Sequence, residues 1–244
     1  GVSVKSMADA STALAVATLA ICYVVGVHNG TIHPETQWPM ISDMFVSIPG
    51  DMISRFGVCM GAVWVGMTQV GHWVVVAPHR TKPNLAIAAH ACSLLGVMGL
   101  MGVGAINEDE NITYHYISAI TFFGGFMIYM VLDLIGSAHH WRGAGRAGAV
   151  VSAALFVGCK LTPLLLRARG GASAGSFVAT LESPVWLAYV EWAGFAALLA
   201  YLLLSNNSLP TCATVKFAFF STEPAGQEGE LRAVRLGEDA YVRM

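Results

Sequence analysis

The sequence predicts an all-α, polytopic membrane protein, a bundle of six transmembrane helices with both termini on the cytoplasmic-equivalent side. Of the 244 residues, 55% are hydrophobic and only 11% are charged, and the mean hydropathy is +0.61. A soluble domain carries about a quarter charged residues, so this chain cannot cover a water-facing surface. Six apolar runs approach the roughly 20 residues that a helix needs to cross the hydrocarbon core. A net charge of -2 excludes the concentrated basic face of a nucleic-acid-binding protein.

Each predicted span has recognisable boundaries. The run 10–27 lacks the polar cleavage region of a signal peptide, so we expect a first membrane span there. Pro78 and Pro83 bracket the loop after the second span, and Pro184 suits the first turn of the sixth helix. Because lipid offers the backbone no hydrogen bonds, the runs are helices rather than strands. The predicted spans are residues 10–27, 53–77, 84–106, 113–137, 147–166 and 184–204.

The domain organisation is a transmembrane domain, residues 1–204, with an outer loop at 28–52, followed by a polar C-terminal tail at 205–244. Basic residues predict the orientation, because cytoplasmic loops are enriched in Lys and Arg. N-x-T sequons at Asn29 and Asn111 lie on the opposite, outer side, and the sequence leaves their glycosylation open. The basic residues on the inner side are Lys5, Arg80, Lys82, Arg142, Arg146, Lys216, Arg232, Arg235 and Arg243.

Ionisable residues inside membrane spans are energetically costly and are therefore functional candidates. Their depth along the helices predicts an inner layer of His72, His90 and Asp133. A second, outer layer is predicted to contain His115 and Glu191 together with Asn107. Lys160 is a further ionisable residue, in the fifth span.

The inner layer allows an enzymatic interpretation, because two histidines and a carboxylate suffice to hold a catalytic metal. The spacing does not support it, since the sequence contains neither HExxH nor HxxxH. Single polar residues on separate helices are more typical of interhelical hydrogen bonds or head-group contacts. We therefore expect no metal, no catalytic residue and no cofactor, with a bound phospholipid as the one ligand to look for.

Small residues predict where helices pack closely, because they let two backbones approach each other. The candidate positions are Gly96, Gly99, Gly102 and Gly104 in the third span and Gly124 and Gly125 in the fourth.

Two stretches carry a resemblance to a known family. The outer loop reads Pro39-Met40-Ile41-Ser42-Asp43, followed by Ile48-Pro49, and the third span ends in Gly104-Ala105-Ile106-Asn107-Glu108. The fourth span reads His115-x-x-x-Ala119-x-x-Phe122-Phe123-Gly124-Gly125-x-x-x-Tyr129-x-x-x-Asp133. This pattern resembles the DRAM family of six-helix membrane proteins, the damage-regulated autophagy modulators. Relatives in that family include a Golgi factor for GPI-anchor lipid remodelling.

The resemblance covers residues 10–204 by helix count and order, and it is specific at 39–49 and 104–133. Phe45 replaces a loop glycine and Asp133 replaces the final glutamine of the family pattern, which identifies a distant member. The resemblance implies that Ser42, Asp43 and His115 are the positions that matter. We expect Asp43 to pair with His115 and lock the loop onto the bundle, and the Ser-Asp pair also suits a short turn or a helix start.

These observations favour a non-enzymatic integral membrane protein of an endomembrane or organelle that binds lipid or partner membrane proteins. Such a protein needs a groove between helices, lined by apolar residues with a few polar groups at its ends. One alternative is an accessory structural subunit of a large membrane complex, which contacts its partners through loop 28–52 and tail 205–244. Another is an intramembrane lipid-modifying enzyme that uses His72, His90 and Asp133.

Overall fold

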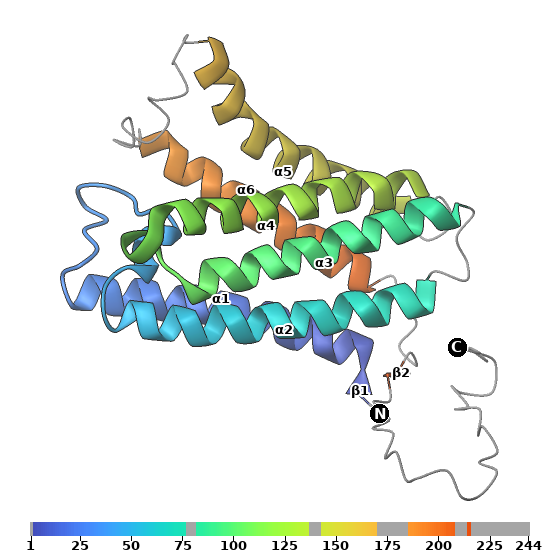
Figure 1. The fold of residues 1–244 in the computed structure, drawn as a ribbon, viewed down its shortest axis with the longest axis horizontal. Coiled ribbons are helices and arrows are strands. Elements are labelled where there is room, and N and C mark those ends of the chain that lie inside the picture. The colour runs from blue at the N-terminus through green and yellow to red at the C-terminus, as the bar shows by residue number, and fades with distance from the viewer. Residues whose placement is uncertain (1, 77–81, 137–142, 170–184, 208–213, 216–244) are drawn as a thin grey trace, which may run out of the picture.

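The computed structural model is a bundle of six long helices (Figure 1). It describes residues 2–76, 82–136, 143–169, 185–207 and 214–215. The six predicted helices are confirmed, and most of their ends lie within a few residues of the predicted bounds. The elements are β1 (Val2–Ser3), α1 (Val4–His28), the 3-10 helix η1 (Ser42–Phe45), α2 (Gly50–Val76), α3 (Pro83–Ala105), α4 (Glu108–Gly136), α5 (Gly143–Arg169), α6 (Val185–Asn207) and β2 (Thr214–Val215).

The bundle has the apolar exterior of an integral membrane protein. Among the described helices, α1, α3, α4 and residues 186–207 of α6 are long and apolar enough to cross a membrane. Large apolar side chains point outward: Val24, Met98 and Ile120 are 63%, 67% and 64% exposed. A water-soluble protein rarely exposes so much apolar surface, whereas lipid tails cover it without cost. That α2 and α5 cross the membrane as well remains a prediction.

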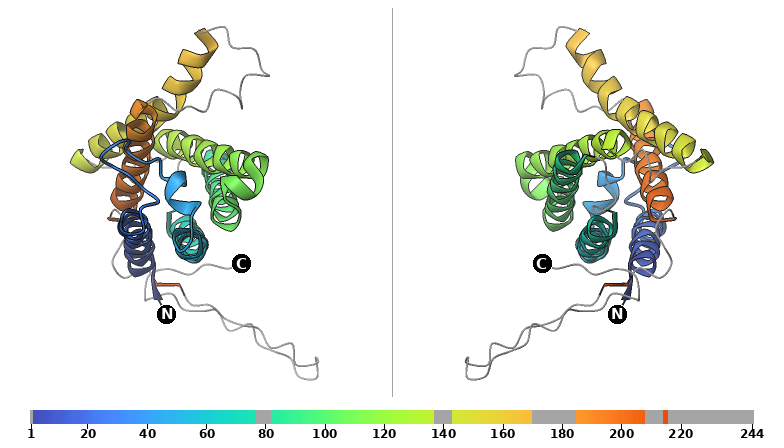
Figure 2. Two further views of the ribbon diagram at one scale, coloured as in Figure 1. Left: turned by 90° about the vertical axis from the view of Figure 1, so that its left-hand side faces the viewer. Right: turned by 90° about the vertical axis from the view of Figure 1, so that its right-hand side faces the viewer.

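Neighbouring helices in the chain are also neighbours in space. Seen end-on, the six helices surround a central region, and η1 lies inside that ring at one end (Figure 2). The pairs α1–α2, α2–α3, α3–α4 and α5–α6 pack extensively, while α1–α6 and α4–α5 meet over shorter stretches. The bundle is therefore made of a four-helix layer and a two-helix layer joined along two looser seams.

The tightest of these contacts, between α3 and α4, depends on glycine. A Cβ atom on Gly125 would lie 2.6 Å from Gly96 N and 2.7 Å from Cys92 O, and one on Gly99 would overlap the backbone of Phe122. The predicted close contact is thus confirmed at Gly96, Gly99 and Gly125. Gly124 is different, because a Cβ atom there would meet nothing within 4 Å.

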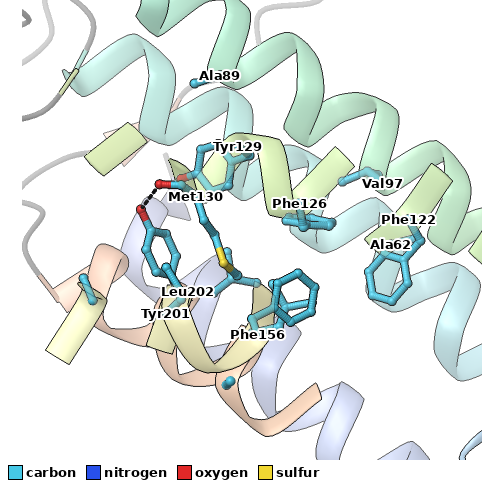
Figure 3. Close-up of a cluster of buried hydrophobic side chains, with 14 residues drawn as sticks. Ala62, Ala89, Val97, Phe122, Phe126, Tyr129, Met130, Phe156, Tyr201 and Leu202 are labelled. Carbon is cyan, nitrogen blue, oxygen red and sulfur yellow. Dashed lines mark hydrogen bonds between the residues drawn. The ribbon is translucent and has the colours of Figure 1, made fainter. Parts of the chain in front are cut away.

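The main apolar core runs through the bundle, and aromatic side chains of α4 and α6 interlock within it (Figure 3). Phe126, Tyr129 and Tyr201 are each no more than 1% exposed. The rings of Phe126 and Tyr129, and of Tyr129 and Tyr201, meet edge to face with centroids 6.2 and 6.1 Å apart. This geometry is favourable for aromatic pairs and fixes the orientation of the two helices.

The start of α1 and the end of α6 lie at the same end of the bundle. Lys5 Nζ donates a 2.8 Å hydrogen bond to Asn207 Oδ1, and β1 pairs antiparallel with β2. An even number of spans requires this arrangement, although which side of the membrane the end faces stays a prediction. Apart from residues 205–207 and 214–215, the predicted tail lies outside the described residues.

Candidate functional site

A cavity of about 560 Å³ lies between the six helices. Every long helix contributes side chains to it, and Ser42, Asp43 and Phe45 of η1 line its outer end, on the side of loop 28–52. Along α6, Leu187 and Leu202 both line the cavity. At 1.5 Å per residue, the fifteen steps from one to the other correspond to about 22 Å, most of the roughly 30 Å hydrocarbon core.

Small residues on the inward faces leave this space open. Gly61 of α2 is buried, yet a Cβ atom on it would meet nothing within 4 Å. Gly57, one turn earlier, behaves differently, because a Cβ atom there would overlap the side chain of Thr18. The cavity therefore begins where α2 separates from α1, and Ala15 and Ala119 widen it from α1 and α4.

The walls are strongly polarised along the membrane normal. Apolar side chains such as Val65, Leu198 and Leu202 line most of the inner part, beside the hydroxyl groups of Ser11 and Thr12, which donate to Ala8 O. Charged residues gather at the outer end, where Asp43, Glu108, Asp109 and Glu191 carry carboxylates and Lys160 carries an ammonium group. The space thus has one end for hydrocarbon and one end for a polar group.

The outer loop is held over the cavity by α6. Glu191 Oε2 accepts a 3.0 Å hydrogen bond from Ile41 N–H, and Trp192 Nε1–H donates to Pro39 O at 3.0 Å. Buried backbone groups need such partners, because each one left unsatisfied costs about 1–3 kcal/mol. These contacts explain why the loop lies inside the ring of helices.

Asp43 stabilises the turn that leads into η1. Its Oδ2 atom accepts a 2.8 Å hydrogen bond from Met40 N–H and so supports a short turn. The start of η1 has no side-chain cap, so the expected capping of a helix start does not occur. Partial desolvation raises the pKa of Asp43 above its ordinary value, and the Met40 hydrogen bond opposes this by favouring the carboxylate. Ser42 lies beside it in the cavity lining.

The expected pairing of Asp43 with His115 is wrong. His115 is buried, and its Nδ1–H donates a 3.0 Å hydrogen bond to Ile106 O in the turn between α3 and α4. Asp43 is already engaged by Met40 N–H. Each side chain meets a nearby backbone group instead of the other side chain, although both line the same cavity.

Lys160 reaches the cavity from the seam between α4, α5 and α6. Its Nζ atom lies 3.4 Å from the centroid of the Phe123 ring, and its stem packs against Gly194, where a Cβ atom would approach Lys160 Cε to 3.2 Å. Within the described part of the chain, no carboxylate comes within ion-pair distance of this ammonium group. A cation–π contact contributes about 0.5–2 kcal/mol. Removing an ammonium group from water costs several kcal/mol, so the charge is only partly compensated.

Asn107 lies outside the cavity and belongs to a polar clamp at the outer edge of the bundle. Its Oδ1 atom caps α4 by accepting from Glu110 N–H at 2.9 Å, and its Nδ2 donates to Asp51 Oδ1 at 3.1 Å. Arg55 completes the clamp with ion pairs of 2.8 Å to Asp51 and 2.6 Å to Glu110. The predicted outer layer is thus divided, because Asn107 joins this clamp while His115 and Glu191 face the cavity.

The predicted inner layer does come together. His90 Nδ1–H donates to Ala86 O at 2.8 Å, which leaves Nε2 of the neutral ring to accept from His72 Nδ1–H at 3.5 Å. His72 Nε2 in turn accepts from the hydroxyl of Ser205 at 3.1 Å. This chain of hydrogen bonds joins α2, α3 and α6.

Asp133 belongs to the same layer and is fully buried. Its Oδ2 atom accepts a 2.8 Å hydrogen bond from the Tyr201 hydroxyl, which also lies 3.4 Å from Met130 O. The Tyr129 ring connects the two parts, with centroids 6.1 Å from Tyr201 and 6.0 Å from His90. Among the described residues, no three His, Cys, Asp or Glu side chains converge in a way that could hold a metal ion.

Comparison with known proteins gives one match. The family model described as Frag1/DRAM/Sfk1/Cwh43P N-terminal domain matches residues 4–207, which includes all six long helices and the η1 segment. No curated protein and no solved structure matches the chain.

Proposed function

The chain belongs to the Frag1/DRAM/Sfk1/Cwh43P family of membrane proteins, and from this premise we propose that it is a non-enzymatic lipid-binding protein that takes a membrane lipid into its central cavity. The polarised cavity is the observation that supports the proposal. Its volume of about 560 Å³ lies within the roughly 300–1,000 Å³ of small-molecule sites.

The shape of the cavity favours an elongated amphiphile. Its apolar part is too hydrophobic to hold ordered water, which needs two to four polar partners. An acyl chain would satisfy this part, and the length of about 22 Å along α6 suits a chain that lies roughly parallel to the helices. A head group would then meet the charged residues at the outer end.

A second feature supplies a route from the bilayer. A lipid-facing groove of about 390 Å³ lies between α1 and α6, with Trp38 and Trp192 at its outer end. Leu19, Phe195 and Leu199 line both this groove and the cavity. These three side chains therefore separate the cavity from the bilayer along one of the looser seams of the bundle.

The alternatives gain less support. His72, His90 and Asp133 are buried and do not line the cavity, so we propose a structural role for them rather than catalysis. The chain does contain one Gly-x-Ser-x-Gly sequence, at residues 171–175, outside the described residues. A role as an accessory subunit, through loop 28–52 and the tail, stays a prediction.

The proposal is tested by filling the cavity. Gly61→Leu places a side chain into the open space beside Gly61, and we expect it to lower retention of palmitoyl-oleoyl phosphatidylcholine at least tenfold, measured by native mass spectrometry of the full chain purified in mild detergent. Gly158→Leu is the matched control, because Gly158 is exposed on α5 and a Cβ atom there also meets nothing. Equal retention by both variants would contradict the proposal.

A second variant guards against misfolding of the first. Ala119→Leu fills the same cavity from α4, and a protein that stays monodisperse but loses lipid would support the proposal independently. Retention of lipid in both cavity-filling variants would exclude the cavity as the site.

A further inference from the structure

The charges at the outer end of the cavity specify a kind of head group. This inference rests on the proposed function, because it concerns the part of the same cavity that an acyl chain leaves unfilled. The relevant side chains come from four different segments: the outer loop, α4, α5 and α6.

Lys160 provides the anion-binding element. Its ammonium group lines the cavity, and within the described residues it has an aromatic face as its close partner but no carboxylate in ion-pair contact. Gly194 makes room for its stem on α6, since a Cβ atom there would lie 3.2 Å from Lys160 Cε and 3.6 Å from Nζ. The side chain is thus held between two helices and makes no hydrogen bond to the described residues, and the carboxylate of Glu191 attracts it from beyond ion-pair distance. A phosphate oxygen would satisfy the donors of the Lys160 ammonium group.

The carboxylates provide the opposite element. Asp43 and Glu191 each accept one backbone hydrogen bond, from Met40 and Ile41, which leaves further lone pairs on both groups. Glu108 lies close enough to both to interact with their charges. Carboxyl groups outnumber the one ammonium group in this part of the cavity lining, so an anionic lipid without a cation of its own would find few favourable partners there.

Only a head group that carries both a negative and a positive charge can bind Lys160 and the carboxyl groups at the same time. We propose that the outer end of the cavity binds the head group of a zwitterionic phospholipid, with its phosphate at Lys160 and its ammonium group between Asp43, Glu108 and Glu191. Phosphatidylcholine and phosphatidylethanolamine carry this combination of charges. Phosphatidylglycerol lacks the ammonium group, and diacylglycerol lacks both charges.

The test compares these four lipids with identical acyl chains. The full chain is incubated in mild detergent with an equimolar mixture, and the bound fraction of each lipid is measured by native mass spectrometry. We expect the two zwitterionic lipids to be retained about tenfold more than phosphatidylglycerol or diacylglycerol. Retention of phosphatidylglycerol at the same level, or retention independent of the head group, would overturn this inference and leave lipid binding by the cavity intact. Loss of all four lipids would overturn the proposed function itself.

Two variants test the lysine and the carboxyl groups separately. Lys160→Met keeps the length of the side chain, and it is expected to lower retention of phosphatidylcholine about tenfold while diacylglycerol is unaffected. Glu191→Gln is expected to narrow the preference for phosphatidylcholine over phosphatidylglycerol. Unchanged preferences in both variants would overturn the inference.

Gly194→Ala offers a check that leaves every charge in place. Its methyl group pushes against the stem of Lys160, so we expect weaker retention of phosphatidylcholine and normal retention of diacylglycerol. The matched control is Gly158→Ala, on the exposed face of α5. Equal behaviour of the two alanine variants would show that the position of Lys160 does not matter.

Discussion

The inner layer and the outer end of the cavity are built from similar polar side chains, but their surroundings differ. At the inner end, His72, Ser205 and Tyr201 are no more than 1% exposed, and their hydrogen bonds run from one helix to the next. At the outer end, Lys160 and Asp43 face an open cavity. A closed network stabilises the bundle, whereas open charges are free to meet a ligand. Polar residues inside a membrane protein are thus better judged by how they are satisfied than by type.

We expect the largest effect on stability from a substitution at Tyr201, in the inner layer. Tyr201→Phe removes the hydroxyl that donates to Asp133, and we expect a loss of about 2 kcal/mol, because the buried acceptor loses a hydrogen bond. This corresponds to a fall in Tm of roughly 4–8 °C, measured by thermal unfolding in detergent. Tyr189→Phe is the control, since Tyr189 is 56% exposed, and it should change stability by less than about 0.5 kcal/mol. Equal Tm values for the two variants would contradict the structural role of the inner layer.

Two serine substitutions compare the inner layer with the cavity lining through the same chemical change. Ser205→Ala breaks the hydrogen bond to His72 and is expected to cost about 1 kcal/mol. Ser42→Ala, in the cavity lining, should leave stability within about 0.5 kcal/mol of the parent. Neither variant changes the acyl-chain space, so lipid retention per folded molecule should stay the same for Ser205→Ala. A loss of lipid there would mean that the inner layer takes part in binding.

We expect the smallest effect at the groove between α1 and α6, where a substitution should change only the rate at which bound lipid exchanges. Ala196→Trp narrows the groove without reaching the cavity lining, so exchange of bound lipid with labelled lipid in vesicles should slow several-fold while the final occupancy is unchanged. Ala193→Trp, exposed on the same helix but outside the groove, should exchange at the parental rate. If both tryptophan variants exchange alike, lipid does not pass through this seam.

Much of the fold follows from the sequence, because lipid forces apolar runs to become helices. The bounds fail where packing or local charge decides: α1 starts at Val4 rather than near residue 10, and Lys5 and Asp9 form a 3.4 Å ion pair in its polar first turns. Depth alone predicts a shared layer of His72, His90 and Asp133, but it does not predict that the two histidines bond to each other while Asp133 bonds to Tyr201. The wrong Asp43–His115 pairing shows the limit of this reasoning, because nearby backbone groups satisfy both side chains.

The cavity itself could not be predicted from the sequence. It depends on the order of helices around the bundle, which places Gly61 opposite open space and Gly57 against Thr18 although both are glycines of one helix face. For the same reason the sequence places Lys160 in neither predicted layer. Only the structure shows that Lys160 lies beside Phe123 of α4 and Gly194 of α6.

An experimental structure of the full chain purified with its own lipids tests most directly whether the cavity holds a lipid. We expect elongated density that runs from Lys160, past Gly61, towards Leu202, with a head group between Lys160 and Asp43. Density for lipid only on the outer faces of the helices, with the cavity filled by side chains or water, would contradict it.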